Sequence, residues 1–281
     1  MQERTPAAAA QAQAKAEGSE HALLLDRPQA GVAVLTLNRS ESRNSLSLAT
    51  IAALNIAFLE LGNDRSVSAI VLAAAGHVFC AGHDLKELTA HRADADRGIA
   101  FFDETMTRCS AMMQAIVACP KPVIAAVQGT ATAAGCQLVA TCDLAVAATS
   151  AKFATPGVNI GLFCSTPMVA LSRNVSRKHA MEMLLLGEMI SAAQAANYGL
   201  VNRVVPDAEV LPEAIALAAK IAAKSPLTVA TGKAAFYVQA EMPLGDAYRY
   251  AAGVMVENMM ARERPTSLTP SVMSVSLGSI G

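Results

Sequence analysis

The chain has 281 residues and a formal net charge of −1; 53% of its residues are hydrophobic and 16% are charged. This length can bury a large core, as one big domain or as a domain with an appendage. The balanced charge excludes a basic field that would attract nucleic acid or an anionic membrane surface, and 4% aromatic residues without tryptophan argue against a base-stacking platform.

Residues 1–20 are rich in Ala and Gln and lack the apolar segment of a secretory signal, so we expect a disordered tail. No apolar run in the chain is long enough to span a bilayer. The six cysteines form no CxxC pair and most have apolar neighbours, which predicts buried reduced thiols in a reducing compartment. We therefore expect a cytoplasmic protein with neither nucleic acid nor a membrane as a partner.

The first predicted strand covers residues 31–37 (GVAVLTL) and follows a turn-like segment at 27–30. An amphipathic helix is expected from about Ser47, and Gly62 suits its end. Its apolar residues recur at three- and four-residue spacing; they are Leu48, Ile51, Leu54, Phe58 and Leu61. A second buried strand is predicted at 67–74.

Residues 76–84 are predicted as a loop in which Asp84 caps a short helix that begins at Leu85. A longer helix is expected at about 95–118. Further strands are predicted at 123–127, 144–148, 152–154 and 202–205. Strands that alternate with helices in this way indicate an α/β fold with parallel strands.

The C-terminal part of the chain is predicted to be helical at residues 210–224, 226–240 and 244–263. These segments carry many alanines and methionines and are apolar on more than one side, which suggests contact between subunits. We expect a core at 21–205, a helical oligomerisation region at 206–264 and a mobile tail at 265–281.

The most informative stretch runs from Ala125 to Asp143. A buried strand passes through a Gly-bounded turn into a helix of small residues that begins at about Ala134. Small residues let the reacting group of a ligand approach the backbone closely. A helix start offers unpaired N–H groups and the positive end of a dipole. The stretch therefore predicts an oxyanion-binding site.

Four motifs, taken in order and spacing, resemble the enoyl-CoA hydratase/isomerase (crotonase) superfamily. They are FCAGHDL at 79–85, QGTATAAGCQL at 128–138, CD at 142–143 and FATPG at 153–157. The resemblance covers about residues 22–262 and is specific as a constellation, although no single motif would suffice. Residues 131–140 and 159–167 are closest to one subgroup of the family.

The resemblance implies an α/β, crotonase-type spiral of ββα units with a C-terminal helical region that builds trimers, often paired into hexamers. It also implies stabilisation of the enolate of an acyl-CoA thioester, with coenzyme A as part of the substrate and no metal or redox cofactor. The thioester oxygen would be held by the backbone N–H groups of His83 and Ala134. The backbone near Ala81 would bind the adenine or pantetheine part. Candidates for phosphate contacts are Arg43, Lys86 and, from a neighbouring subunit, Lys233.

The chain departs from the family where hydratases carry two glutamates, because Gln137 and Gly157 occupy those positions. Neither residue can exchange a proton at neutral pH. A positioned acid or base contributes roughly 10²–10⁴-fold, so we expect hydration to be slower by at least about 10⁴. Three interpretations stay open: an enolate-stabilising enzyme, a decarboxylase in which Gln137 and Asn159 donate amide hydrogen bonds, and a non-catalytic acyl-CoA binder.

The sequence lacks the residues that three other classes of protein need: serine hydrolases, dinucleotide-binding proteins and metalloenzymes. The sequence has no G-x-S-x-G elbow of a serine hydrolase, no G-x-G-x-x-G after the first strand and no His/Cys/Asp cluster at metal-ligand spacing. The side chain of His83 is expected to face solvent or the mouth of the CoA site. Cys164 is expected to pack rather than react, because no cationic neighbour is evident. Ala133 and Ala134 replace glycines common in the family and should narrow the acyl pocket.

Overall fold

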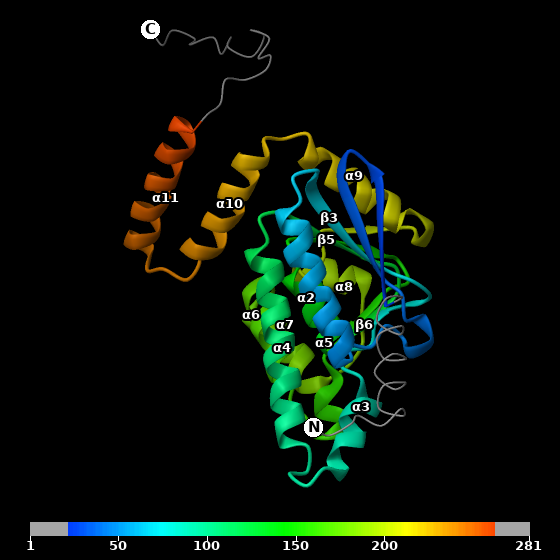
Figure 1. Cartoon of the computed structure of the whole chain (residues 1–281). Helices are drawn as coiled ribbons and strands as arrows, with labels where there is room; N and C mark the ends of the chain where they lie inside the picture. Colours follow the sequence, from blue (N-terminus) through cyan, green and yellow to red (C-terminus); the bar gives the residue numbers. More distant parts are fainter. Residues whose placement is uncertain (1–21, 262–281) are drawn as a thin grey trace, which may run out of the picture. The chain divides into compact units, whose positions relative to one another are not determined.

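The structure is a computed structural model that describes residues 22–261. The chain forms two compact units, of which the first ends at Lys233 and the second begins at Ala234. Among the described residues, all the strands lie in the first unit, and the second contains the end of one helix and the whole of the last described helix (Figure 1). The tails expected at 1–20 and 265–281 lie outside the described residues.

Six strands form the large sheet. In their order across the sheet they are β1 (Leu23–Gln29), β2 (Gly31–Leu37), β3 (Val67–Ala74), β5 (Val123–Val127), β7 (Leu144–Ala148) and β10 (Arg203–Val205). Neighbours from β2 to β10 are parallel, whereas β1 pairs antiparallel with β2. The parallel strands are apolar along most of their length, as is typical of strands covered on both faces, and β5 is buried at every residue.

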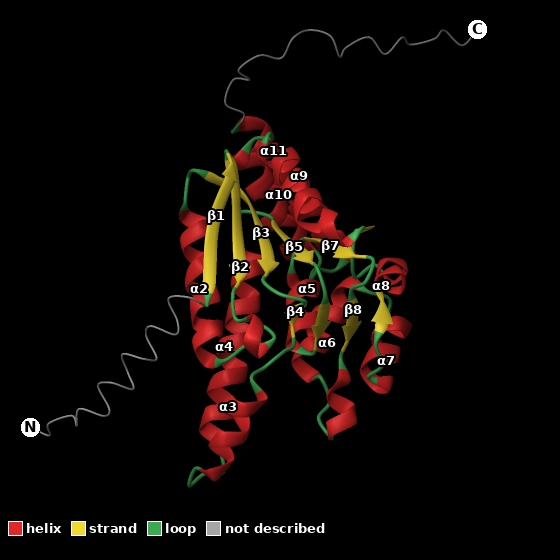
Figure 2. Ribbon diagram, turned by 90° about the vertical axis from the view of Figure 1, so that its right-hand side faces the viewer, coloured by secondary structure: helices red, strands yellow, loops and turns green. Residues whose placement is uncertain are grey.

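Four short strands form a second sheet. In order they are β4 (Val78–Cys80), β6 (Thr130–Thr132), β8 (Lys152–Ala154) and β9 (Ile190–Ser191). The first three are parallel to one another. Each of β3, β5 and β7 is followed in the chain by a strand of the small sheet, so the chain alternates between the two sheets as it winds (Figure 2). With the intervening helices this is a spiral of ββα units, which confirms the predicted fold class.

Helices cover both sheets. They are α2 (Leu48–Asn63), α3 (Leu85–Ala90), α4 (Ile99–Ala118), α5 (Ala134–Thr141), α6 (Ser165–Asn174), α7 (Arg177–Leu186), α8 (Ala192–Tyr198), α9 (Val210–Ala222), α10 (Pro226–Gln239) and α11 (Leu244–Met260). Short 3₁₀ turns lie at η1 (Ser40–Ser42), η2 (His91–Ala93), η3 (Pro156–Ile160) and η4 (Asp207–Glu209). Helix α2 lies beside α4 (Figure 1), and α9 packs on β2, β3, β5 and β7. Helix α9 therefore belongs with the core.

The local sequence explains why α2 forms where it does. The Ser47 hydroxyl accepts a hydrogen bond from the Thr50 N–H at 3.2 Å and so caps the first turn. The predicted apolar face is buried at Ile51, Leu54, Phe58 and Leu61. The helix continues one residue past Gly62, which lies within the last turn rather than at the end.

Four of the described strands were not predicted: β1, β4, β6 and the two-residue β9. The turn expected at 27–30 is the end of β1, an edge strand that tolerates Pro28 because an edge needs fewer N–H donors. The pairing register of β1 shifts beside this proline. The loop expected at 76–84 contains β4, and the turn after β5 contains β6. Strands of three residues are too short to show an alternating pattern.

The described part of the second unit, residues 234–261, exposes many apolar side chains. Met260 is 83% exposed, and Phe236, Leu244, Tyr248 and Met259 are also mostly exposed. Among residues 22–261 no single helix has the length and hydropathy of a membrane span; Asp207–Ala222 and Pro226–Gln239 reach them only together, with a bend of 106° between them.

Candidate active site

The backbone of residues 81–84 is bound to Leu46. The Leu46 N–H donates to the Gly82 carbonyl at 2.8 Å, and the Asp84 N–H donates to the Leu46 carbonyl at 3.1 Å. In a parallel bridge of this kind, the residue between the two bonded ones directs its N–H away from the partner strand, and that residue is His83. Within residues 22–261 the His83 N–H has no acceptor. This N–H is therefore available to a ligand.

Helix α5 begins without a side-chain cap. Ala133, just before it, has φ 51° and ψ −119°, a conformation that a residue with a side chain adopts only under strain. The first bond within the helix runs from the Gln137 N–H to the Ala133 carbonyl at 3.0 Å. The N–H groups of residues 134–136 therefore have no partner inside the helix. The Ala134 N–H stands at the positive end of the helix.

Two glycines let these segments meet. A Cβ on Gly82, which has φ +91°, would lie 3.2 Å from the Ala134 nitrogen and 2.9 Å from the Ala133 Cβ. A Cβ on Gly135 would lie 2.1 Å from the carbonyl oxygen of Cys80, so no larger residue fits there. The residues next to the two candidate donors are therefore in contact. That both N–H groups bind one oxygen stays a prediction.

A buried asparagine, which sequence reasoning missed, fixes the approach to this loop. The Asn44 Oδ1 accepts from the Arg39 N–H at 2.9 Å, and its Nδ2 donates to the carbonyls of Ala75 and Val78 at 2.9 and 2.8 Å. Asn44 has φ 51°, a left-handed conformation in which asparagine is enriched. The available signal was an asparagine in the loop between β2 and α2.

Two carboxylates also hold the loop. Asp84 caps α3 as predicted, because its Oδ1 accepts from the N–H groups of Lys86 and Glu87 at 3.1 and 3.3 Å. Its Oδ2 accepts from the Ser45 hydroxyl at 3.0 Å. The Glu87 Oε2 accepts from the Leu48 N–H at 2.9 Å. Both side chains therefore position backbone.

The side chain of His83 was expected to face either solvent or the mouth of the CoA site, and the structure contradicts the first of these. Its Nε2 atom is buried rather than solvent-facing, and it has no hydrogen-bond partner in the described chain. Burial lowers the pKa of His83, because the charged imidazolium loses hydration. The ring is therefore neutral at pH 7.

Gln137 lies one turn into α5 and is 5% exposed. Its Oε1 atom is buried and has no hydrogen-bond partner in the described chain. The backbone of the same residue is satisfied, because its carbonyl accepts from the Thr141 hydroxyl at 2.8 Å and its N–H bonds Ala133. The side chain thus offers a neutral buried amide near the helix start.

Gly157 lies in η3 and has no room for a side chain. A Cβ there would lie 2.3 Å from the Leu162 carbonyl oxygen and 2.8 Å from the Cys164 Sγ. The Cys164 thiol thus occupies the space beside Gly157. Burial raises the pKa of Cys164, which keeps the thiol protonated and is consistent with packing rather than nucleophilic attack.

Asn159, expected to donate to a substrate carboxylate, uses its amide elsewhere. Its Nδ2 donates to the Gly187 carbonyl at 3.1 Å, at the C-terminus of α7. A Cβ on Gly187 would lie 2.9 Å from that nitrogen, so the contact is tight. The structure therefore gives Asn159 a role in joining η3 to α7.

The three candidate cations have different surroundings. Arg43 and Lys86 are exposed, and the Arg43 carbonyl accepts from the Ala81 N–H at 3.1 Å, which places Arg43 beside the loop. Lys233 is instead buried within its own chain, its side chain only 6% exposed and bonded to Asp143 at 2.7 Å. The expectation that Lys233 reaches a phosphate is therefore replaced by a structural role.

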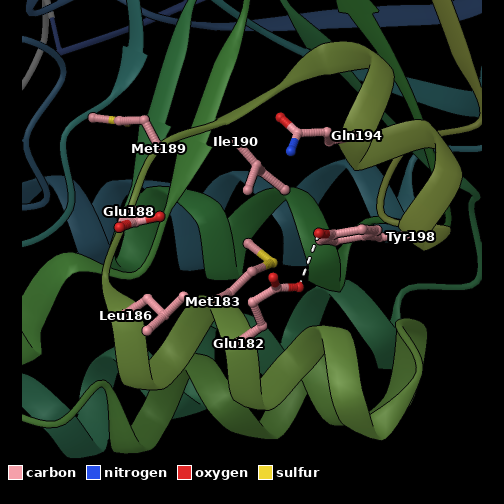
Figure 3. A pocket seen from close by; sticks show the side chains of 8 residues that line it. All are labelled: Glu182, Met183, Leu186, Glu188, Met189, Ile190, Gln194 and Tyr198. Carbon is pink, nitrogen blue, oxygen red and sulfur yellow. Dashed lines mark hydrogen bonds between the residues drawn. The ribbon is translucent and has the colours of Figure 1, made fainter.

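The hollow that Figure 3 shows lies elsewhere, between α7, β9 and α8. Apolar and polar side chains line it together: Met183, Leu186, Met189 and Ile190 with Glu182, Glu188, Gln194 and Tyr198. The Tyr198 hydroxyl donates to Glu182 at 2.9 Å across it. None of the candidate site residues lines this hollow.

The chain is similar to proteins of known family. A family model described as enoyl-CoA hydratase/isomerase matches residues 27–269. The crystal structure of an enoyl-CoA hydratase from Mycobacterium smegmatis is 53% identical, with a TM-score of 0.81 over 85% of this chain and 91% of that chain. The crystal structure of human enoyl-CoA hydratase domain-containing protein 3 is 46% identical, with a TM-score of 0.80 over 86% and 93%. The rat mitochondrial protein of that name is 46% identical over 245 residues, 87% of this chain and 80% of its own length.

These relatives confirm the family resemblance and the subgroup that residues 131–140 and 159–167 indicated. They contradict the expected location. The relatives of that name from rat, human, mouse and Xenopus laevis are all called mitochondrial, and not cytoplasmic. Cysteine content was a poor guide, because reduced buried thiols are not particular to one compartment.

Proposed function

The chain belongs to the enoyl-CoA hydratase/isomerase family, and from that premise we propose that it binds an acyl-CoA thioester and stabilises the enolate of its acyl group. The thioester oxygen would lie between the N–H groups of His83 and Ala134. The observation that carries the proposal is the contact of Gly82 with Ala134, which joins a free N–H to an uncapped helix start. Such donors are worth roughly 2.7–4 kcal/mol each once charge develops on the oxygen.

Ordinary hydration is expected to be slow. Neither the amide of Gln137 nor Gly157, which has no side chain, can transfer a proton. We therefore expect the hydration rate to be at least about 10⁴-fold below that of a hydratase with two glutamates. A second candidate is decarboxylation of a carboxyacyl-CoA, because loss of CO₂ itself generates the enolate. The neutral Gln137 favours it, since an amide N–H can donate to a carboxylate that a glutamate would repel. A binder without turnover would use the same contacts.

We expect the exposed apolar side chains of residues 234–261 to associate, so that the protein forms trimers or hexamers. Coenzyme A enters as part of the substrate, and the proposed chemistry needs no metal or redox cofactor. Light scattering at micromolar concentration tests the assembly, and a monomer would contradict it.

The oxyanion proposal is tested with two ligands that differ by one oxygen. Butyryl-CoA carries the thioester carbonyl, and S-butyl-CoA is the thioether without it. Two hydrogen bonds of about 1 kcal/mol each predict roughly 30-fold tighter binding of the thioester by calorimetry. Equal affinities would contradict the proposal.

A matched pair of variants locates the effect. Gly82→Ala places a methyl group against Ala134 at a left-handed φ, so it should abolish the thioester preference. Gly232→Ala meets no atom within 4 Å and should leave the preference unchanged. Turnover of a panel of acyl-CoA and carboxyacyl-CoA thioesters then separates the enzyme from the binder.

A further inference from the structure

The hollow between α7, β9 and α8 carries negative charge and no positive charge (Figure 3). Glu182 and Glu188 are two of the eight residues that line it, and none of the eight is a lysine, arginine or histidine. Within residues 22–261 neither carboxylate forms a salt bridge. No residue of the candidate oxyanion site lines the hollow. The hollow is therefore a separate place at which a positively charged ligand would be favoured.

The floor of the hollow is apolar. Met183 and Ile190 are only 2% and 7% exposed, and Leu186 lies beside them at half exposure. Apolar walls with a few fixed polar groups are typical of sites for small organic ligands. A bare metal ion fits less well, because the described residues hold no group of three or more His, Cys, Asp or Glu that could bind one. The lining thus suits an organic cation with an aliphatic body.

Hydrogen bonds and ring stacking hold the polar walls in place. The Tyr198 ring stacks on His179, with 3.8 Å between the ring centroids and 7° between the ring planes. The Tyr198 hydroxyl donates to Glu182 at 2.9 Å, so the phenolic oxygen can still accept a hydrogen bond. The Gln194 Oε1 accepts from the N–H and the hydroxyl of Ser191 at 2.9 and 3.0 Å, which fixes this amide. The polar groups of the hollow are therefore preorganised.

The backbone of α7 is anchored to the segment around η3. The Met183 carbonyl accepts from the buried Thr155 hydroxyl at 2.9 Å, and the Gly187 carbonyl accepts from the Asn159 amide at 3.1 Å. These bonds hold the helix that supplies the floor of the hollow. A ligand would therefore enter a space whose backbone is already fixed, and binding would add little ordering cost.

We propose that the hollow is a binding site for a primary alkylammonium group. The ammonium would lie between Glu182 and Glu188, and its methylene chain would lie on Met183 and Ile190. A primary ammonium has three N–H donors, which match two carboxylates and the phenolic oxygen of Tyr198. A free diamine and the lysine side chain of another protein both carry this group. The inference does not depend on the proposed function, because it concerns different residues.

Methionine methyl groups report binding at this place, because Met183 and Met189 line the hollow. The full chain is labelled with carbon-13 at the methionine methyl groups, and the two NMR signals are assigned through Met183→Leu and Met189→Leu. We expect 1,4-diaminobutane to shift both signals, with a dissociation constant on the order of 1 mM for a ligand of this size. Butane-1,4-diol has the same length without charge, and tetramethylammonium has the charge without N–H donors. Both should bind at least about tenfold more weakly.

Two variants and a control locate the effect. Glu182→Gln and Glu188→Gln each remove one charge from the hollow at nearly constant shape. Each should weaken binding of diaminobutane about two- to fivefold, as is typical of exposed ion pairs. Glu60→Gln removes an exposed glutamate of α2, outside the hollow, and should leave the affinity unchanged.

A lysine derivative distinguishes the two sources of the ammonium. N-acetyl-lysine-N-methylamide presents the side chain as a protein would, between two peptide groups. If it binds more tightly than diaminobutane, the source is a protein, and if it binds more weakly, the source is a free amine; either result supports the ammonium site.

Three results would overturn the inference. They are the absence of a shift of either methyl signal with both amines, equal binding of butane-1,4-diol, and an affinity that neither Glu182→Gln nor Glu188→Gln reduces. Each of them leaves the proposed function standing, because that function is tested with other ligands and other variants.

Discussion

Replacing Lys233 by methionine should strongly destabilise the protein. The Lys233 Nζ donates to three acceptors: the Ile116 carbonyl at 2.9 Å, the Lys121 carbonyl at 3.1 Å and the Asp143 carboxylate at 2.7 Å. Asp143 also accepts from the Val123 N–H at 2.7 Å, at the first residue of β5. One ammonium group therefore joins α10 to the end of α4 and to the start of two strands.

The magnitude follows from the burial of both charges. The side chains are 6% and 16% exposed, so removal of the ammonium breaks a largely buried ion pair and takes from Asp143 the positive charge that Lys233 supplies. Breaking such a pair costs about 3–5 kcal/mol, because the remaining ion keeps its desolvation penalty. At about 2–4 °C per kcal/mol, Lys233→Met should lower Tm by roughly 6–20 °C.

Denaturant unfolding of a double-mutant cycle checks the reasoning. In Lys233→Met with Asp143→Asn, the buried charge is gone and the asparagine oxygen can still accept from the Val123 N–H. The double variant should therefore be more stable than Lys233→Met alone, with a coupling free energy of about 2–3 kcal/mol. Lys224→Met, at an exposed lysine, is the control and should change stability by less than about 0.5 kcal/mol. Additive single effects, or a loss below 1 kcal/mol for Lys233→Met, would refute the account.

Three further predictions concern the site. Gly157→Glu should destabilise the protein by more than about 2 kcal/mol and restore no hydration, because its Cβ would lie 2.3 Å from the Leu162 carbonyl oxygen; a stable, active hydratase would contradict this. Gly135→Ala should push α5 away from the Cys80 carbonyl oxygen, because a Cβ would lie 2.1 Å from it. The variant should lose about 1–3 kcal/mol of stability and the preference for the thioester. Unchanged melting temperature and unchanged binding would show that the approach is not tight. Burial lowers the pKa of His83 below its ordinary value near 6.5, so the unfolded chain binds more protons between the two values and the free energy of unfolding should fall as pH drops below about 6.5. His83→Gln should make that dependence shallower in unfolding experiments at pH 5 to 8, and an unchanged slope would count against it.

The sequence predicted the large sheet better than the small one. Segments such as 67–74 and 123–127 are continuous apolar runs, which a strand buried on both faces requires, and the structure places β3 and β5 there. In the small sheet the strand predicted at 152–154 is β8, whereas the two-residue β9 was missed, and so were β4 and β6, which have three residues each. Their backbones are defined by pairing with each other, a contact between residues about 50 positions apart.

The side chains of the site also differ in how far their partners lie along the chain, and only the local contacts could be predicted. Asp84 accepts from two N–H groups in its own helical turn, so its capping role could be inferred locally, whereas its contact with the Ser45 hydroxyl could not. The burial of Lys233 could not, because its partners lie 90 to 117 positions away in the chain. The orphaned oxygen of Gln137 was equally hidden, since a sequence shows which atoms can bond and not which remain unbonded.

The packing around Gly157 has a consequence for new chemistry at the site. Because the Leu162 carbonyl oxygen and the Cys164 sulfur occupy the space that a Cβ would need, any substitution at this position meets an occupied space. A carboxylate at this position therefore requires the loop from 158 to 164 to change its shape as well. Residue 157 and this loop form one steric unit, so new chemistry at the site is more accessible through side chains that already have room.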